Sequence, residues 1–279
     1  MRESKFVLRS PNGDIRGNFV EANESAPCIL LCCGHNGFYH FGFFPELQKT
    51  LAKYHFSSVA FNYSHCGITN DGDVFNDLEL YEKNCRQLES EDIYFMSCEI
   101  KSSSFFGNPS NLMLLAHSMG GVSATAAMKN YLNDSNHIDA LILLCSMKTL
   151  DVRTKETMEE WIENGVFYRT NSRTNQELPQ GKFFLEETLQ ANSNWSVENA
   201  IKTIEKPILV AHSVEDESVP FEHGEALYDW SRENNSLNTF LPIPHANHTL
   251  NTSHTGDRNS KELQFFIYHL VEWLDKCLS

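Results

Sequence analysis

A serine, an aspartate and a histidine that lie far apart along the chain have the types and the order of a nucleophile, an acid and a base: Ser118, Asp216 and His248. A serine hydroxyl is a weak nucleophile unless a neighbouring imidazole takes its proton, and the imidazole needs a carboxylate that fixes its tautomer and orientation. If the fold brings the three side chains together, Ser118 can attack a carbonyl carbon and form a covalent acyl-enzyme. The elements around each residue therefore decide the interpretation.

Ser118 follows the apolar run 112–115 and precedes a pair of glycines and the Ala-rich run 122–132. This order predicts a strand, a sharp turn and a helix, and a serine at the tip of such a turn needs small neighbours, as in the pattern G-x-S-x-G. The chain has Ala116 at the first glycine position. The five residues alone fit an ordinary strand-to-helix loop equally well. We expect the neighbouring His117 to pack rather than to act in catalysis.

Asp216 lies in an acidic turn after the apolar segment 207–212, in the pattern D-x-x-V-P. A turn after a buried strand is where the acid of such a site is expected. Glu215 and Glu217 flank Asp216 and are alternatives, and Asp216 could also be a simple capping residue. The spacing to Val-Pro favours Asp216 as the acid.

His248 lies in the segment PIPHANHT, after a short strand predicted over residues 238–241. His245 and His254 are alternative bases, but His245 directly follows a proline at the strand end, so we prefer His248. The three histidines could instead form a metal site with the spacing H-x-x-H-x5-H. Because no standard zinc signature has this spacing in a loop, we predict neither a metal nor a cofactor.

Apolar runs without alternation, which are typical of strands buried on both faces of a parallel sheet, alternate along the chain with segments of helical spacing. After an opening antiparallel hairpin, the predicted strands are 28–33, 57–62, 112–115, 138–145, 207–212 and 238–241. The predicted helices are 44–54, 77–103 with a break near Ser90, 122–132, 223–232 and 261–278. This order predicts an α/β fold with a mostly parallel sheet of about eight strands, flanked by helices.

Residues 148–206 separate two of these strands and are rich in charged residues, Asn and Thr. They contain helix-like stretches at 155–164 and 182–191, with the irregular stretch TNSRTNQELPQG between them. An excursion of this size suggests a small cap over the carboxyl edge of the sheet, where open α/β sheets bind ligands. We therefore expect a core of residues 1–147 and 207–279 and a cap of residues 148–206.

Composition narrows the possible partners and the compartment. The formal net charge is −15 and no stripe of Lys or Arg compensates it, so a nucleic-acid partner is not expected. The N-terminal stretch has no apolar export signal, and no apolar run is long enough to cross a bilayer. The eight cysteines are scattered and form no C-x-x-C pair. We therefore expect free thiols, no membrane span and a cytoplasmic location.

From CCGHNG through AHSMGG and D-x-x-V-P to the ANHT loop, the chain resembles the α/β-hydrolase fold family. The resemblance implies that Ser118 is the nucleophile, Asp216 the acid and His248 the base. It also implies an oxyanion hole made by the backbone N–H groups of Met119 and His35, with an incidental role for the His35 imidazole. The family loop usually reads His-Gly-x, and here it reads Cys-Gly-His.

The stretches CGHNGFYHFGFFPEL and GVFYRTNSRTNQELPQG further resemble a bacterial group of small capped hydrolases often labelled esterases, whose substrates are uncharacterised. The resemblance implies a serine esterase that acts on a small-molecule ester. The same three residues would also serve a thioesterase, an amidase or a peptidase, because neither fold nor triad determines the leaving group. A hydrolase-fold protein that binds a small apolar ligand without turnover is the alternative from another class.

Overall fold

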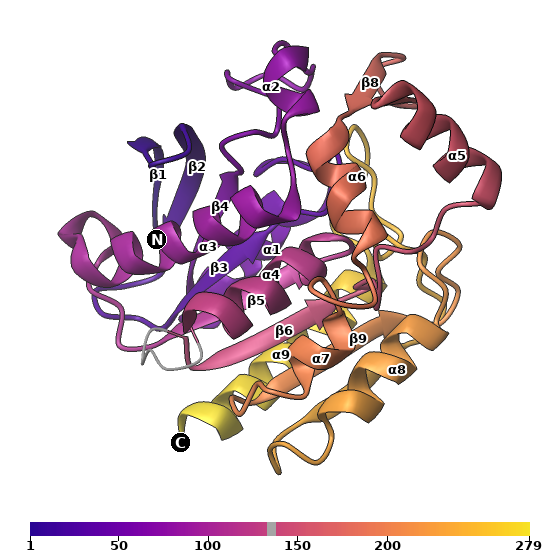
Figure 1. Cartoon of the computed structure of the whole chain (residues 1–279). Helices are drawn as coiled ribbons and strands as arrows, with labels where there is room; N and C mark the ends of the chain where they lie inside the picture. Colours follow the sequence, from indigo (N-terminus) through magenta and orange to yellow (C-terminus); the bar gives the residue numbers. More distant parts are fainter. Residues whose placement is uncertain (133–137) are drawn as a thin grey trace.

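The computed structural model describes residues 1–132 and 138–279, and its centre is one eight-stranded sheet (Figure 1). The strand order is β1-β2-β4-β3-β5-β6-β9-β10. The strands are β1 (Arg2–Arg9), β2 (Asp14–Glu21), β3 (Cys28–Cys32), β4 (Ser57–Asn62), β5 (Leu112–His117), β6 (Ala140–Leu144), β9 (Ile208–Ser213) and β10 (Thr239–Ile243). Strands β1 and β2 pair antiparallel, as do β2 and β4, and the remaining pairs are parallel. The predicted mostly parallel α/β sheet is confirmed.

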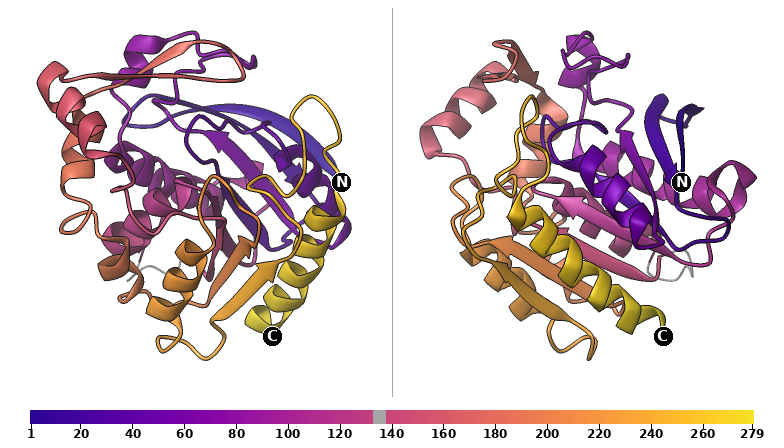
Figure 2. Two further views of the ribbon diagram at one scale, coloured as in Figure 1. Left: turned by 90° about the vertical axis from the view of Figure 1, so that its right-hand side faces the viewer. Right: turned by 180° about the vertical axis from the view of Figure 1, so that it is seen from behind.

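Helices cover both faces of this sheet. Helices α1 (Phe44–Lys53) and α9 (Lys261–Leu278) lie on one face, which Figure 2 shows from behind. Helices α3 (Arg86–Ser102), α4 (Gly120–Ala127), α7 (Val197–Ile201) and α8 (Glu222–Ser231) lie on the other. The central strands β3, β4, β5, β6 and β9 are buried along their whole length, which explains their apolar runs without alternation.

Residues 78–102 form two helices rather than one. Helix α2 (Leu78–Glu82) ends before Cys85, whose extended backbone begins α3. The predicted break near Ser90 is therefore wrong. The carboxylate of Glu187, from a segment distant in sequence, accepts hydrogen bonds from the N–H groups of Arg86 and Gln87 at 2.6 and 2.8 Å. These first N–H groups of α3 have no partner inside the helix, so a tertiary contact supplies one.

Between β6 and β9 the chain forms α5 (Lys155–Asn164), the antiparallel strands β7 (Phe167–Thr170) and β8 (Glu177–Gln180), α6 (Lys182–Leu189) and α7. The expectation that TNSRTNQELPQG is irregular is wrong, because this stretch includes β8 and the turn that precedes it. The Asn171 side chain accepts from the N–H groups of Arg173 and Thr174 and so shapes the turn. Strand β7 is partly or fully exposed, whereas β8 is exposed at Glu177 and buried over residues 178–180, so neither strand shows an apolar alternation. The division into core and cap remains a proposal.

Two short helical stretches complete the secondary structure, the 3₁₀ turn η1 (Ser104–Phe106) and the π-helical η2 (Met128–Leu132) that continues α4. All eight cysteines are free thiols, as expected. Within residues 1–132 and 138–279, no helix combines the length and the apolar character that a membrane span requires.

Candidate active site

Ser118 begins the two-residue turn, residues 118–119, between the end of β5 and the start of α4. Its φ of +58° lies in the left-handed region, which residues with a side chain rarely adopt. Backbone hydrogen bonds hold this conformation: the Ser118 N–H donates to the Leu144 carbonyl at 3.0 Å, and the Ser118 carbonyl accepts from Gly121 and Met147. The strain is therefore offset by the surrounding structure, and the hydroxyl lines the cavity described below.

Two glycines allow the loop after β3 to approach this turn. A Cβ on Gly34 would lie 2.7 Å from the Ser118 Cβ, and a Cβ on Gly120 would lie 2.4 Å from the Cys33 carbonyl oxygen. Real Cβ atoms do not tolerate such distances, so a side chain at either position would push the loop and the turn apart. Ala116, which replaces the usual glycine, is fully buried in β5 without such a clash.

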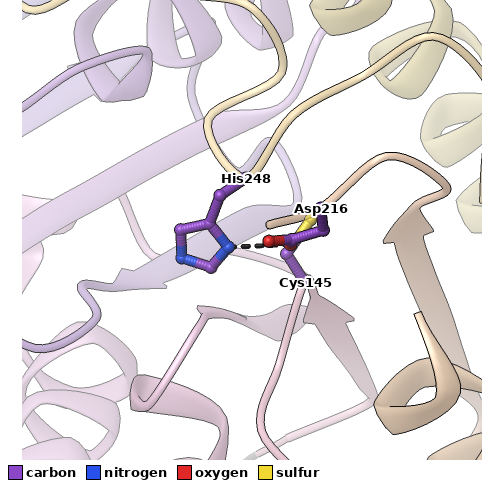
Figure 3. A group of neighbouring side chains, drawn as sticks. All are labelled: Cys145, Asp216 and His248. Carbon is purple, nitrogen blue, oxygen red and sulfur yellow. Dashed lines mark hydrogen bonds and ion pairs between the residues drawn. The ribbon is translucent and has the colours of Figure 1, made fainter. Parts of the chain in front are cut away.

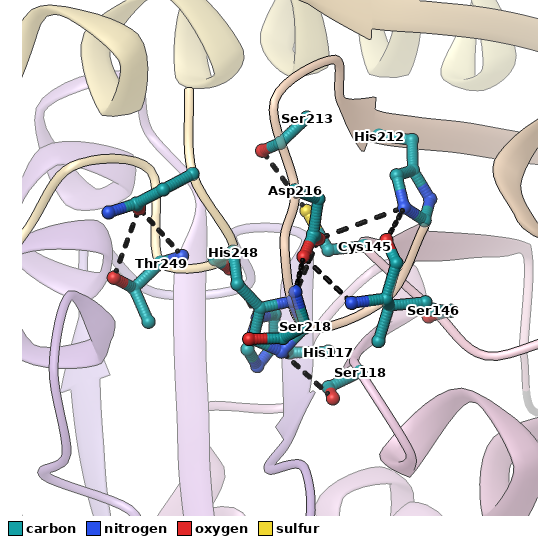
Figure 4. A network of polar contacts seen from close by, with 12 residues as sticks. His117, Ser118, Cys145, Ser146, His212, Ser213, Asp216, Ser218, His248 and Thr249 are labelled. Atoms are coloured by element: carbon teal, nitrogen blue, oxygen red, sulfur yellow. Dashed lines mark hydrogen bonds and ion pairs between the residues drawn. The ribbon is translucent and has the colours of Figure 1, made fainter. Parts of the chain in front are cut away.

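The structure brings Ser118, His248 and Asp216 into one chain of hydrogen bonds (Figure 4). The His248 Nε2 lies 3.0 Å from the Ser118 Oγ, and the His248 Nδ1 lies 2.8 Å from the Asp216 Oδ2. Because a carboxylate can only accept, Nδ1 carries the proton and Nε2 is free to accept the serine proton. This is the geometry in which a histidine can act as base toward Ser118.

Asp216 is held in its charged form by its surroundings. Burial raises the pKa of this carboxyl, but the hydrogen bond from His248 and the N–H groups of Val219 and Ser218, at 2.8 and 2.9 Å, more than offset that effect. The net pKa of Asp216 therefore lies below its ordinary value. The Asp216 side chain is fully shielded from solvent, whereas Glu215 is exposed and pairs with the exposed His245.

His117 supports the loop that carries His248. The His117 Nε2 donates to the His248 backbone carbonyl at 3.0 Å, and the two ring centroids are 4.7 Å apart. Burial, together with the nearby His248, lowers the pKa of His117 to about 3, so its ring is neutral. It packs, as expected, and also holds the backbone of His248 through this hydrogen bond.

The histidines that could have formed a metal site do not gather. His254 binds Asp73 at 2.9 Å, and His245 faces Glu215. In the part of the chain that the structure describes, the one group of potential ligands whose atoms lie within 4.8 Å of one another is Cys145, Asp216 and His248 (Figure 3). Burial raises the pKa of the Cys145 thiol to about 12, and the two other members are already bonded to each other. A protonated thiol is a poor metal ligand, so this donor set fits the hydrogen-bond chain better than a metal.

Met119 and His35, whose backbone N–H groups are the expected oxyanion donors, line the same cavity as Ser118. Neither N–H has an acceptor among the described residues. The His35 imidazole has a contact that the sequence did not indicate: its Nε2 lies 2.8 Å from the Gln180 side-chain nitrogen of β8. Burial, with smaller contributions from nearby arginines, lowers the pKa of His35 well below its ordinary value. This neutral ring joins the loop after β3 to residues 148–206.

A cavity of about 680 Å³ opens beside Ser118 and His248. Its walls come from the loop after β3, the turn at Ser118, the loop after Asp216 and residues 148–206. The last segment contributes Val152, Arg153, Arg169, Thr170, Asn171, Ser172 and Arg173. The sequence interpretation missed the three arginines, although their clustering in one polar insertion was a visible signal.

Comparisons with known proteins agree with this architecture. Residues 67–277 match the prolyl oligopeptidase family. A comparison with curated proteins finds no match. Among solved structures, the chain is similar to Est1E from Butyrivibrio proteoclasticus with bound ferulic acid (15% identity, 98% of this chain and 99% of that chain, TM-score 0.74). It is also similar to DcsB in complex with a substrate analogue (14% identity, 99% of each chain, TM-score 0.75).

A third similar structure is a puromycin-hydrolysing peptidase from Mycobacterium tuberculosis (14% identity, TM-score 0.67). The alignment covers 100% of this chain and 39% of that chain. At these identities the similarity establishes the fold. The α/β-hydrolase fold expected from the sequence is confirmed.

Proposed function

The chain belongs to the prolyl oligopeptidase family of α/β-hydrolases, and from this premise we propose that it is a serine hydrolase of carboxylic esters. The observation that carries the proposal is the unbroken chain of hydrogen bonds from Asp216 through His248 to the Ser118 hydroxyl. With its proton on Nδ1, His248 donates to Asp216, and its Nε2 can accept the proton of the Ser118 hydroxyl.

In the first half of the reaction, the His248 Nε2 takes the Ser118 proton while Oγ attacks the ester carbonyl carbon. The N–H groups of Met119 and His35 would stabilise the negative charge on the carbonyl oxygen, and Asp216 would stabilise the imidazolium. When the tetrahedral intermediate collapses, the bond to the alcohol oxygen breaks and His248 returns its proton to that oxygen. The acyl group remains on Ser118.

In the second half, His248 deprotonates a water molecule that attacks the acyl carbon. The bond to Ser118 Oγ breaks, His248 returns the proton to Oγ, and the carboxylic acid leaves. The sum is the addition of one water across the ester bond. No step needs a cofactor.

The cavity supports a small ester rather than a peptide with a free N-terminus. In the described part of the chain its lining contains no aspartate and no glutamate, so a substrate ammonium group would find no counter-charge there. The similar protein Est1E was solved with bound ferulic acid, a small carboxylic acid.

We propose that residues 148–206 act as a cap over the core of residues 1–147 and 207–279, because they supply much of the cavity wall. The eight free cysteines favour a reducing compartment such as the cytoplasm.

Cleavage of an amide or peptide bond is the second candidate, favoured by the family to which the chain belongs and by its similarity to a puromycin-hydrolysing peptidase. Turnover of p-nitrophenyl butyrate, a butyryl thioester and butyryl p-nitroanilide separates these reactions, because the acyl group is constant and only the leaving group changes. We expect the ester to have the highest kcat/KM after correction for its intrinsic reactivity.

Replacement of Ser118 by alanine tests the nucleophile. We expect Ser118→Ala to lower the turnover of p-nitrophenyl butyrate by at least about a thousandfold, because Ser118 is the cavity serine whose hydroxyl is hydrogen-bonded to His248. The circular dichroism spectrum should not change, since among the described residues His248 is the one hydrogen-bond partner of the hydroxyl.

Labelling with a fluorophosphonate probe provides the control. The probe should label the wild type and Ser172→Ala, which changes another cavity serine, but not Ser118→Ala. Turnover that survives Ser118→Ala would show that Ser118 is not the nucleophile. A folded wild type that neither reacts with the probe nor hydrolyses any acyl substrate would instead favour a ligand-binding protein.

A further inference from the structure

The charge of the cavity wall is opposite to that of the whole molecule. The chain has 37 acidic and 22 basic residues and a formal net charge of −15. The cavity beside Ser118 is nevertheless lined by three arginines, Arg153, Arg169 and Arg173, and by no acidic residue among those that the structure describes. In a chain with this excess of acidic residues, a cavity wall of average composition would contain more carboxylates than guanidinium groups. The excess of arginine in this wall therefore requires an explanation.

Arg153 has no carboxylate partner among the described residues. Its Nη2 donates to the Gln180 side chain at 2.7 Å, and its guanidinium lies over the rings of Trp161 and Phe184, at 4.7 and 5.1 Å. The Nη1 atom is buried and has no hydrogen-bond partner in the described structure. A desolvated guanidinium that lacks a counter-charge is costly, because neither water nor protein compensates it fully.

Arg173, in the turn between β7 and β8, has a similar environment. Its guanidinium lies over Phe38 and Phe41, at 4.5 and 5.0 Å, and both Nε and Nη2 are buried without a hydrogen-bond partner among the described residues. Asp73 is the one carboxylate that acts on its pKa, but Asp73 is already bonded to two histidines, His40 and His254. Arg173, which lines the cavity, therefore has two buried guanidinium nitrogens that no described residue satisfies.

The positive charges act together. Arg169 lines the same wall, and burial together with the charges of Arg169 and Arg86 lowers the pKa of Arg153 to about 10. Arg86 is itself neutralised by an ion pair with Glu89 at 2.8 Å. Within the cavity wall the guanidinium groups of Arg153 and Arg169 therefore repel each other, and a bound anion would relieve that repulsion.

We propose that the cavity selects esters whose acid or alcohol part carries a carboxylate, which Arg153 and Arg173 bind. This inference rests on the proposed esterase function and names its substrate class. The planar fork of a guanidinium matches a carboxylate with two parallel hydrogen bonds, and the aromatic rings beneath both arginines hold the forks in place. The alternative is that both arginines serve only to pack on aromatic rings, in which case the charge of the substrate has no effect.

Two pairs of substrates that differ only in one charge test the proposal. In the first pair, p-nitrophenyl hydrogen adipate carries a free carboxylate and methyl p-nitrophenyl adipate does not. In the second, 4-(carboxymethyl)phenyl butyrate is compared with its methyl ester, which places the charge in the alcohol part. We expect the wild type to prefer the anionic member of at least one pair by about tenfold in kcat/KM, mainly through KM.

Variants assign that preference to the arginines. Arg173→Met and Arg153→Met keep much of the apolar stem but remove the charge, and each should lower the preference by about fivefold or more. Arg173→Lys should retain part of it. Arg232→Met removes the same charge from the exposed end of α8, where Arg232 pairs with Asp229, and should leave the preference unchanged.

The outcomes separate this inference from the proposed function. A preference of at least fivefold that falls in the Arg153 and Arg173 variants but not in Arg232→Met supports the inference. A smaller preference in both pairs, or equal losses in all three methionine variants, overturns it. If the wild type hydrolyses p-nitrophenyl butyrate and reacts with the fluorophosphonate probe, the esterase proposal stands in either case. If both of these fail, the esterase proposal is itself wrong.

Discussion

His117 shows how a residue beside the proposed nucleophile can act on the proposed base. It ends β5, directly before Ser118, and its ring donates to the backbone of His248, more than a hundred residues later in the chain. That bond needs a neutral ring with its proton on Nε2, and burial supplies the neutral form. The same contact makes the site sensitive to acid, because burial and the nearby His248 disfavour a protonated imidazole more than the charge of Asp216 favours it.

Acid destabilisation tests this role of His117. Its pKa is about 3 in the folded chain, below its ordinary 6.5, so the unfolded chain binds the proton more tightly and stability is lost as the pH falls through this window. His117→Asn can still donate to the His248 carbonyl but does not titrate. Between about pH 7 and about pH 5, urea unfolding should show that the wild type loses about 2 kcal/mol more than the variant. Parallel pH profiles would contradict the assignment.

The N-terminus of helix α3 is stabilised by a residue from a distant part of the chain. Its first N–H groups are bound by Glu187 from α6, which is nearly one hundred residues later and is buried. A negative charge at a helix N-terminus is favourable because the unpaired N–H groups there carry partial positive charge. The contact also attaches residues 148–206 to the layer of helices on the sheet.

Removing that charge should destabilise the chain. Glu187→Gln leaves the shape of the side chain but replaces one carboxylate oxygen by a donor that cannot accept, and we expect a loss of about 1–2 kcal/mol in the free energy of unfolding. Glu186→Gln, at the exposed neighbouring position, is the matched control and should change it by less than about 0.5 kcal/mol. Chemical denaturation measures both free energies of unfolding. Equal losses in the two variants would mean that the hydrogen bonds between Glu187 and the N-terminus of α3 do not contribute specifically to stability.

At the scale of the whole molecule, stability is concentrated in the sheet and the two layers of helices. The two apolar clusters lie on opposite faces of the sheet and include strands β3, β5, β6 and β9. Strand β7, in contrast, is partly or fully exposed along its length and pairs only with β8. This contrast supports the proposal that residues 148–206 behave as a cap with its own lower stability.

Hydrogen exchange measures that difference directly. We expect the amides of β5 and β6 to exchange only through global unfolding, and those of β7 and β8 to exchange at least about a hundredfold faster through local opening. Peptide-resolved mass spectrometry at neutral pH resolves the two groups. If β7 and β8 exchanged as slowly as the central strands, the division into core and cap would have to be abandoned.

The order of elements was predictable because burial on both faces of a parallel sheet leaves continuous apolar runs that local sequence displays. The helix at 261–278 was predicted within its observed bounds for a similar reason, since its apolar spacing follows the face that packs on the sheet. The break before α3 and the strand β8 were missed, because Glu187 and the Asn171 turn stabilise them through contacts that no local pattern reports.

The sequence by itself determined the fold class and which residues could serve as nucleophile, acid and base, because each of the three follows an apolar strand in a turn of recognisable composition. Only the tertiary structure decided that His248 rather than His245 faces Ser118, that His117 supports it, and that arginines from residues 148–206 line the cavity. These features depend on distances between segments that are remote in sequence. Local patterning records how each segment is buried, but not which polar side chains meet across the folded chain.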